Sequence, residues 1–252
     1  MPNKRIIVFF LIILLLGILS LYYPQFTGNI IKIPENNYQK EPAILIRVVD
    51  GDTIHALVNG KDETIRLLGI NTPEKGMPFS ENAASFLKKF ENKTILLERD
   101  FEDKDKYYRK LRYVFYENRF LNLEIVENGF ANAYYYHGLI YENQFINAEK
   151  QARTLEQGIW KKSNNICASC IILKELNSEA EFFTIENICS FECNLAGWFV
   201  KDAGRNTFEL SNLAPKTKSQ HNSSKGKEVW NNEGDKFFMF HEKGYLVIYY
   251  VY

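Results

Sequence analysis

The sequence predicts a mainly β protein with some α-helix: a small Greek-key barrel of five strands flanked by three helices, followed by a second all-β region. Apolar and polar residues alternate with the period of half-buried strands. This alternation covers residues 43–49, 53–58 and 63–68. Between the last two segments, Asn59-Gly60 is the strongest short signal for a hairpin. We therefore expect neighbouring strands joined by a tight turn.

An apolar run opens the chain, ahead of the barrel. Residues Ile6–Tyr23 contain eighteen residues without a charge, preceded by Lys4 and Arg5. A run of this length can cross a membrane as a helix, and the basic flank predicts a cytoplasmic N-terminus. A cleaved signal peptide has a shorter apolar core and small residues at its cleavage site. We expect residues 1–23 to be an uncleaved anchor, residues 24–42 a polar tether, and the remaining domains extracytoplasmic, or secreted if the segment is cleaved.

The remaining segments up to residue 157 are three helices and three further strands. The predicted helices are residues 80–89, 122–128 and 143–157, and the predicted strands are residues 94–99, 111–116 and 131–136. In the first helix, Ala83, Phe86 and Leu87 recur at helical spacing, which predicts a packed apolar face. Gly129 and Gly158 follow the other two helices, where glycine commonly ends a helix.

From Cys167 onward the pattern changes to short strands separated by turn residues, with no helical period. Frequent short strands predict a β-sandwich. We expect Trp198 and Trp230 to be core residues, and the polar segment Lys216–Lys227 to be a loop.

Four cysteines lie in this second region, as the pairs Cys167/Cys170 and Cys189/Cys193. Such spacing can hold a tetrahedral zinc or form two disulfides. Export favours disulfides, because they persist outside the cytoplasm. The connectivity cannot be deduced from the sequence.

The overall charge does not indicate a nucleic-acid partner. Lysine and arginine number 31, as do aspartate and glutamate, so the net charge is zero. A chain without a basic balance can still bind phosphate through a few local arginines. Function must therefore be inferred from particular residues.

Two polar loops lie at the tips of neighbouring predicted strands. They are Asp50–Thr53 and Asn71–Glu74, and either one alone is more simply explained as a turn. Together they offer the side-chain and carbonyl oxygens that a hard cation such as Ca²⁺ takes as ligands. Arg66 and Glu74 lie close enough in this arrangement to share a substrate. For Arg66 the simpler explanation is a salt bridge to Asp62 or Glu63 on the strand face.

A third motif, Asp105-Lys106-Tyr107-Tyr108-Arg109, precedes the strand at 111–116. With the three motifs in this order, the sequence resembles the staphylococcal nuclease (thermonuclease) family over residues 43–162. The resemblance implies an oligonucleotide-binding-type barrel, which binds nucleic acid on one face and its adjoining loops. It also implies hydrolysis of phosphodiester bonds.

The resemblance assigns roles residue by residue. The implied catalytic residues are Arg66, Glu74 and Arg109; the implied Ca²⁺ site is Asp52, Asn71 and the Thr72 carbonyl; the implied substrate contacts are Lys106, Tyr107 and Tyr135. The planar fork of arginine gives bidentate bonds to phosphate and keeps its charge. Glu74 would act as the general base or orient the attacking water. Tyr135 would stack on a base without regard to sequence.

Two residues depart from the family pattern. Asn71 stands where the family usually has an aspartate, so the cation site has one fewer negative charge. Because ligand charge tunes Ca²⁺ affinity, we expect weak binding that suits millimolar external Ca²⁺. Tyr108 stands where the family has a glycine, which would alter the aim of Arg109.

The second region, residues 163–252, is similar to the lamin-tail domain family. The similarity rests on the segments Asn194–Asp202, Trp230–Asp235 and Gly244–Tyr249. It implies an immunoglobulin-like sandwich that binds nucleic acid or an envelope component and carries no catalytic motif. Deletion of residues 164–252 is therefore expected to leave cleavage of short oligonucleotides intact.

These observations predict a membrane-anchored, extracytoplasmic, Ca²⁺-dependent nuclease that cleaves DNA and RNA with little sequence preference. The alternative is a catalytically inactive barrel that binds nucleic acid or protein, in which Asn71 marks a lost metal site. Retention of Arg66, Glu74 and Arg109 separates the two, because an inactive module has no need of that set.

Overall fold

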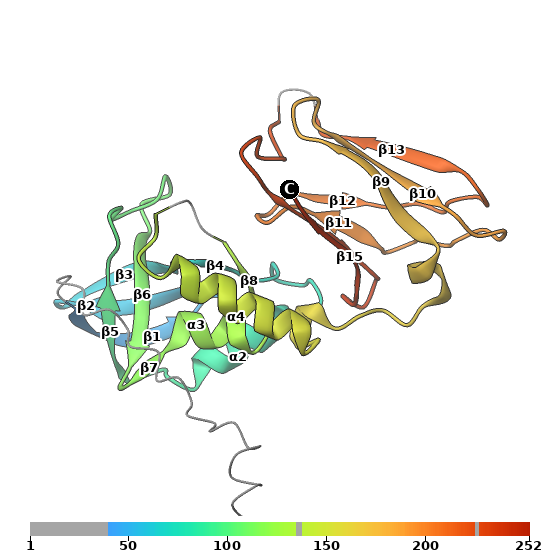
Figure 1. Cartoon of the computed structure of the whole chain (residues 1–252). Helices are drawn as coiled ribbons and strands as arrows, with labels where there is room; N and C mark the ends of the chain where they lie inside the picture. The colour runs from blue at the N-terminus through green and yellow to red at the C-terminus, as the bar shows by residue number, and fades with distance from the viewer. Residues whose placement is uncertain (1–39, 135–137, 225–226) are drawn as a thin grey trace, which may run out of the picture. The chain divides into compact units, whose positions relative to one another are not determined.

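The computed structural model describes residues 40–134, 138–224 and 227–252, which belong to one compact unit (Figure 1). The predicted anchor, residues 1–23, lies outside the described residues, as does the tether up to residue 39. Within the described ranges, no helix is long and apolar enough to cross a membrane.

A closed barrel forms the first part of this unit, as the alternating pattern predicted. Its strands are β1 (Glu41–Val48), β2 (Thr53–Val58), β3 (Lys61–Leu67), β5 (Thr94–Glu98) and β6 (Lys110–Tyr116). They follow the order β3-β2-β1-β5-β6, and a parallel pairing between β3 and β6 closes the ring. The prediction of a five-stranded barrel is confirmed.

The β2–β3 hairpin sets the register that places the later site residues. Its turn residues Asn59 and Gly60 both have positive φ, at 50° and 79°. A two-residue turn with positive φ at both positions matches the right-handed twist of the strands, which explains the Asn-Gly pair. In the resulting register Thr53 lies opposite Arg66, and the closing pairing places Arg66 opposite Leu111 of β6.

Three helices pack beside one another against the barrel, as predicted (Figure 1). They are α2 (Ser80–Lys88), α3 (Leu121–Glu127) and α4 (Glu142–Thr154), and the short elements of this part are β4 (Ile70–Asn71), β7 (Arg119–Phe120), β8 (Asn132–Ala133) and the 3₁₀ turn η1 (Gly158–Trp160). The predicted strand at 131–136 is short, and residues 135–137 lie outside the described part. Strand and helix residues share one core, which includes Leu45, Ile54, Ile65, Leu87 and Phe145.

Two antiparallel sheets form the second part. The first contains β9 (Ile171–Asn177), β10 (Phe182–Asn187) and β13 (Lys218–Asn222), and the second contains β11 (Phe199–Lys201), β12 (Thr207–Glu209), β14 (Lys236–Phe240) and β15 (Leu246–Val251). Both sheets contribute to one core, with Phe183 and Phe237 among its buried residues. Trp198 and Trp230 are buried there, as predicted. The prediction of a loop over Lys216–Lys227 is wrong in part, because β13 pairs with β10 there.

All four cysteines form disulfides, joining Cys167 to Cys193 and Cys170 to Cys189. The bonds tie the turn η2 (Ile166–Ser169) and the residue after it to the loop after β10. The zinc alternative is wrong, because no thiolate is left to bind a metal.

The two parts share an apolar cluster and a buried ion pair. Trp160 and Ile159 of the barrel side pack with Phe238 and Phe240 of β14. Next to this cluster, Lys236 Nζ of β14 lies 2.7 Å from Glu149 Oε2 of α4 and donates to the Ala133 carbonyl at 2.8 Å. Removing the second part would expose the apolar cluster to water and break the buried Lys236–Glu149 pair, so the two parts stabilise one another.

We expect peptide mapping without reductant to find the two bonds Cys167–Cys193 and Cys170–Cys189. The double variant Cys170→Ser/Cys189→Ser opens a link across a sequence separation of 19. It should lose about 3 kcal/mol of unfolding free energy in urea, because a disulfide over a loop of this length restricts the unfolded chain by about that amount. A map that joined Cys167 to Cys170 would contradict this pairing.

Candidate functional site

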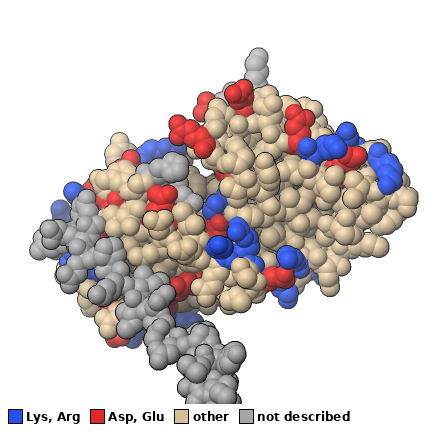
Figure 2. All heavy atoms as spheres, in the orientation of Figure 1, with Lys and Arg blue, Asp and Glu red and all other residues tan. Residues whose placement is uncertain are grey.

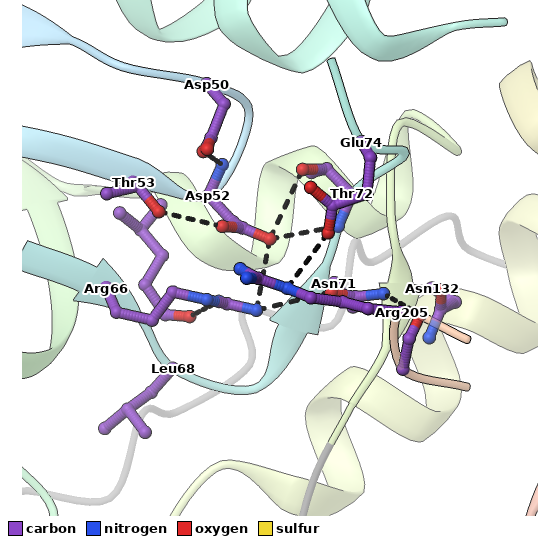
Figure 3. A network of polar contacts seen from close by, with 12 residues as sticks. Asp50, Asp52, Thr53, Arg66, Leu68, Asn71, Thr72, Glu74, Asn132 and Arg205 are labelled. Carbon is purple, nitrogen blue, oxygen red and sulfur yellow. Dashed lines mark hydrogen bonds and ion pairs between the residues drawn. The ribbon is translucent and has the colours of Figure 1, made fainter. Parts of the chain in front are cut away.

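A buried carboxylate, that of Asp52, lies at the centre of the polar network in Figure 3. Its Oδ2 accepts hydrogen bonds from the Thr72 amide at 3.2 Å and the Thr72 hydroxyl at 3.3 Å. The same oxygen lies 3.1 Å from Arg66 Nη2, while Oδ1 accepts from the Thr53 hydroxyl at 3.1 Å. Asp52 therefore joins the two predicted loops and the strand residue Arg66.

A glycine permits the two loops to approach so closely. A Cβ atom on Gly51 would lie 2.6 Å from Ala83 Cβ of α2 and 2.8 Å from the Thr72 hydroxyl oxygen. Real Cβ atoms do not come this close to other heavy atoms, so any larger residue at this position would push the Asp50–Thr53 loop away from Thr72. Gly51 thus fixes the distance between the loops that carry the oxygen ligands.

Arg66 is buried on β3 and points into this network. Besides its pair with Asp52, its Nη2 lies 3.4 Å from Asn71 Oδ1. The strand-face partners considered from the sequence are wrong, because Asp62 pairs with His55 and Glu63 pairs with Lys110. The Arg66 guanidinium is held at the loop tips instead.

Arg109 approaches the same place from the segment before β6. Its Nε donates to Asp105 Oδ2 at 2.7 Å, and its Nη1 lies 3.5 Å from the Thr53 hydroxyl. Burial raises the pKa of Asp105, but the hydrogen bonds from Arg109 outweigh burial and lower that pKa below its ordinary value. Arg109 thus contacts Thr53 while Arg66 contacts Asp52, so both arginines meet the same two-residue segment.

The other predicted substrate residues lie at the edge of this arrangement. Tyr107 is 62% exposed, with Lys106 Nζ 5.3 Å and the Arg109 guanidinium 5.5 Å from its ring centre. Tyr108 adopts a φ of 63°, a left-handed conformation that favours glycine, and its side chain is exposed. The tyrosine thus takes a glycine-like backbone while Arg109 stays bonded to Asp105. Tyr135 lies outside the described residues.

Glu74 follows Thr72 on the loop after β4, and half of its side chain is exposed. Its Oε1 lies 2.9 Å from Nε of Arg205, a residue of the second part of the chain. Figure 3 shows Glu74 beside Thr72 and on the same side of the network as Asp52. The predicted carboxylate therefore lies at the site together with an arginine that the sequence analysis did not identify.

Asn71 is buried and also contacts the second part of the chain. Its Nδ2 donates to the carbonyls of Ala203 at 3.1 Å and Gly204 at 2.9 Å. Asn132, paired with Asn71 between β8 and β4, donates to the same Ala203 carbonyl at 3.1 Å. Because carbonyl oxygens only accept, Nδ2 must face them and Oδ1 faces Arg66. An aspartate at position 71 could make neither bond.

The donor set suits a hard cation. The described residues hold no cluster of three or more histidine, cysteine, aspartate or glutamate side chains, but Ca²⁺ also accepts amide and carbonyl oxygens. Burial raises the pKa of Asp50, and the nearby charge of Asp52 raises it further. The oxygens of Asp52, Asn71 and Thr72 are of the kind that Ca²⁺ takes. Arg66 Nη2 lies 3.1 Å from Asp52 Oδ2 and 3.4 Å from Asn71 Oδ1, so a cation would share these two oxygens with the guanidinium.

Two further charged residues of the second part border the site. Burial lowers the pKa of Lys201 to about 8, while the charges of Asp202, Glu74 and Asp52 act in the opposite direction. Burial raises the pKa of Asp202 to about 6, against hydrogen bonds from Asn206 that lower it. The electrostatic field at the site thus comes from charged residues of both parts of the chain.

Elsewhere on the surface, positively and negatively charged side chains are interspersed. On the face drawn in Figure 2, lysine and arginine lie among aspartate and glutamate rather than in one broad patch. The equal totals of the two signs agree with this. A polyanion would therefore be attracted through the few arginines described above and not through a field over the whole surface.

Comparison with known proteins covers the region that carries these residues. A family model described as staphylococcal nuclease homologue matches residues 64–162. The thermonuclease of Staphylococcus hyicus is 31% identical over 151 residues, which are 57% of this chain and 89% of that protein. The chain belongs to the staphylococcal nuclease family.

Two other similar proteins align over a comparable share of the chain. The thermonuclease of Staphylococcus intermedius is 32% identical over 160 residues, covering 60% of this chain and 95% of that protein. Endonuclease YncB of Bacillus subtilis is 34% identical over 145 residues, covering 53% of this chain and 69% of that protein. The comparisons give no support to the lamin-tail resemblance of the second part, which stays a prediction.

The contacts that sequence reasoning missed are those of Asn132, Arg205 and the carbonyls of Ala203 and Gly204. Arg205 lies 131 positions after Glu74, and no local pattern links the two. The one available signal was Asn71 itself, because replacing a carboxylate with an amide adds a hydrogen-bond donor that requires an acceptor.

We expect Asp52→Ala to lower the unfolding free energy by about 3–5 kcal/mol in urea denaturation, because it leaves the Arg66 guanidinium buried without its partner. Glu124→Ala is the matched control. It breaks the Arg119–Glu124 pair, in which 45% of the arginine side chain is exposed, and should cost no more than about 1 kcal/mol. Equal losses in the two variants would show that the Asp52–Arg66 pair is not structurally important.

Proposed function

We propose that this chain is a Ca²⁺-dependent nuclease that hydrolyses the phosphodiester bonds of DNA and RNA with little sequence preference. The observation that carries the proposal is the convergence of Arg66 and Arg109 on Asp52 and Thr53, with Glu74 beside them. Strand register produces this convergence, since Arg66 lies opposite both Thr53 and Leu111. Membership of the staphylococcal nuclease family, whose relatives include thermonucleases and an endonuclease, supports the same reaction.

The two arginines bind and orient the scissile phosphate. Each guanidinium can form two parallel hydrogen bonds to phosphate oxygens and does not lose its charge. Asp105 holds Arg109 through Nε, so that Nη1 faces Thr53. Asp52 holds Arg66 through Nη2. Positive charge fixed before the substrate arrives stabilises the charge that builds up on phosphorus-bound oxygens during attack.

Glu74 serves the attacking water. Its carboxylate is half exposed at the mouth of the network, where a water can reach it. As a general base it would take the water proton, and as an orienting group it would hold the water in line with the phosphorus. Either role is of the kind that contributes about 10²- to 10⁴-fold to the rate.

Asp52, Asn71 and the Thr72 carbonyl would hold the Ca²⁺. Ca²⁺ bound there supplies charge neutralisation at a phosphate oxygen and a fixed point for orienting the substrate. The neutral amide of Asn71 gives the site one fewer negative charge than an aspartate would, which lowers its affinity.

The proposal also covers where the enzyme is located and what the second part of the chain does. The predicted anchor at residues 1–23 would hold the enzyme to the membrane with its domains outside the cytoplasm, and the two disulfides agree with an oxidising compartment. A lamin-tail-like second part would contribute attachment to nucleic acid or to an envelope component. Lys106 and Tyr107, with Tyr135, would contact the bound nucleotide.

The test is cleavage of a labelled single-stranded oligonucleotide by the full chain in mild detergent. We expect turnover in millimolar Ca²⁺ and none in excess chelator. Glu74→Gln and Arg109→Ala should each lower kcat by about 10²-fold or more, because each removes one group from the reacting centre. Arg119→Ala, which alters an arginine remote from these residues, should leave kcat unchanged.

Two outcomes would contradict parts of this proposal. Turnover that persists in chelator would remove Ca²⁺ from the reaction. Binding of the oligonucleotide without cleavage, unaffected by Glu74→Gln, would favour the inactive binding module instead.

We also expect calorimetry to detect Ca²⁺ binding with a Kd of about 10⁻⁴ to 10⁻³ M, the range of extracellular sites with few charged ligands. Asp52→Ala should abolish the binding heat, because it removes the central carboxylate. Asp103→Ala is a suitable control, since Asp103 pairs with Arg112 at a different place. Loss of binding in both variants would indicate non-specific attraction rather than a site.

A further inference from the structure

The loop Asp202–Asn206 of the second part reaches the site of the barrel. It follows β11 and ends at β12, and it brings the Ala203 and Gly204 carbonyls and the Arg205 side chain to the residues around Asp52. Three hydrogen bonds from Asn71 and Asn132 fasten its backbone to the barrel. The loop is therefore attached to the element that carries the predicted ligands.

The loop is also closed on itself and fixed to its own sheet. Asp202 Oδ1 accepts from the Asn206 amide at 3.0 Å, and Oδ2 accepts from Asn206 Nδ2 at 2.6 Å. The Ala203 amide donates to Asp235 Oδ1 at 3.2 Å. The two ends of the loop are bonded to each other, and its middle is bonded to the barrel. Such a short segment has little conformational freedom, so Arg205 is held in one place.

Glu74, by contrast, has little to hold it within the barrel. It lies on an exposed loop, and in the part of the chain that the structure describes Arg205 is the residue that pairs with its carboxylate. A free glutamate side chain samples several rotamers, and a catalytic group that moves by about 1 Å can lose roughly 10²-fold in rate. The place of this carboxylate is set by a residue outside the barrel.

Resting on the proposed nuclease function, we propose that Arg205 is a positioning residue for Glu74: the C-terminal part of the chain completes the nuclease site by holding the carboxylate that serves the attacking water. The barrel alone then contains the catalytic groups but lacks the residue that orients Glu74. This replaces the expectation that deletion of residues 164–252 leaves cleavage intact.

The pair leaves Glu74 able to act. Arg205 Nε contacts Oε1, and a carboxylate offers about four acceptor positions on its two oxygens, so the other oxygen can bind a water. A half-exposed ion pair is also weak, so it directs the side chain without trapping its charge. Arg205 therefore orients Glu74 without preventing its carboxylate from binding a water.

The test is a double-mutant cycle between Glu74 and Arg205, with kcat and KM measured separately on a short single-stranded DNA in millimolar Ca²⁺. We expect Arg205→Ala in the full chain to lower kcat about 10-fold with KM changed less than about 2-fold, since orientation and not binding is lost. Arg205→Lys should recover part of the loss, because the ammonium can reach the same carboxylate. In the Glu74→Gln background, Arg205→Ala should have no further effect on kcat.

Arg119→Ala is the matched control, because Arg119 is also a half-exposed arginine paired with a glutamate, remote from the site. Melting temperatures of all variants exclude unfolding as the cause of a loss. If Arg205→Ala fails to fold, Arg205→Gln, which keeps most of the side chain, takes its place in the cycle.

The outcomes separate this inference from the proposed function. A wild-type chain that does not cleave DNA contradicts the nuclease itself. A wild-type chain that cleaves, with kcat unchanged by Arg205→Ala, leaves the nuclease standing and overturns the positioning role. An equal loss in the wild-type and Glu74→Gln backgrounds would show that Arg205 acts on the substrate instead, and a rise in kcat would show that the pair restrains the enzyme.

Discussion

The buried carboxylate of Asp52 is the interaction on which the site depends. It is bound by the Thr72 amide and hydroxyl, the Thr53 hydroxyl and the Arg66 guanidinium. A charge so far from solvent is tolerated only when its oxygens are paired. The same contacts also hold the two loops and strand β3 in a fixed arrangement. The groups that pair the carboxylate are the groups that a phosphate and a cation would use.

Strand pairing explains how residues far apart in the chain reach this carboxylate. The β2–β3 register places Arg66 opposite Thr53, and the parallel closure of the barrel adds β6, whose first residues follow Arg109. Closure thus brings two arginines 43 positions apart to neighbouring strand ends. The helices fill the core beneath and contact the loops at points such as Ala83, which lies against Gly51. The fold supplies a rigid support, and the loops carry the chemistry.

The barrel could be inferred from the sequence because its signals are local, whereas the candidate site residues were named through the order of three motifs and the family resemblance that this order carries. Alternation, the Asn59-Gly60 turn and the helical spacing of Phe86 and Leu87 each depend on a few neighbouring residues. The contacts of Asn71 and Glu74 with residues 203–205 could not be inferred, because they depend on how two sheets of the second part meet the barrel. The strand β13 was missed for a different reason: its polar residues pair through the backbone, which no side-chain pattern records.

The amide of Asn71 limits which barrels and second parts can be combined in one chain. Its nitrogen faces two carbonyl oxygens of the second part, so the aspartate typical of the family would place oxygen against oxygen there. A barrel that carries an aspartate at this position would meet repulsion from these carbonyls, and this barrel separated from the second part would lose both acceptors of its Asn71 amide. The two halves are therefore matched as a pair, and exchange of either one requires compensating change in the other.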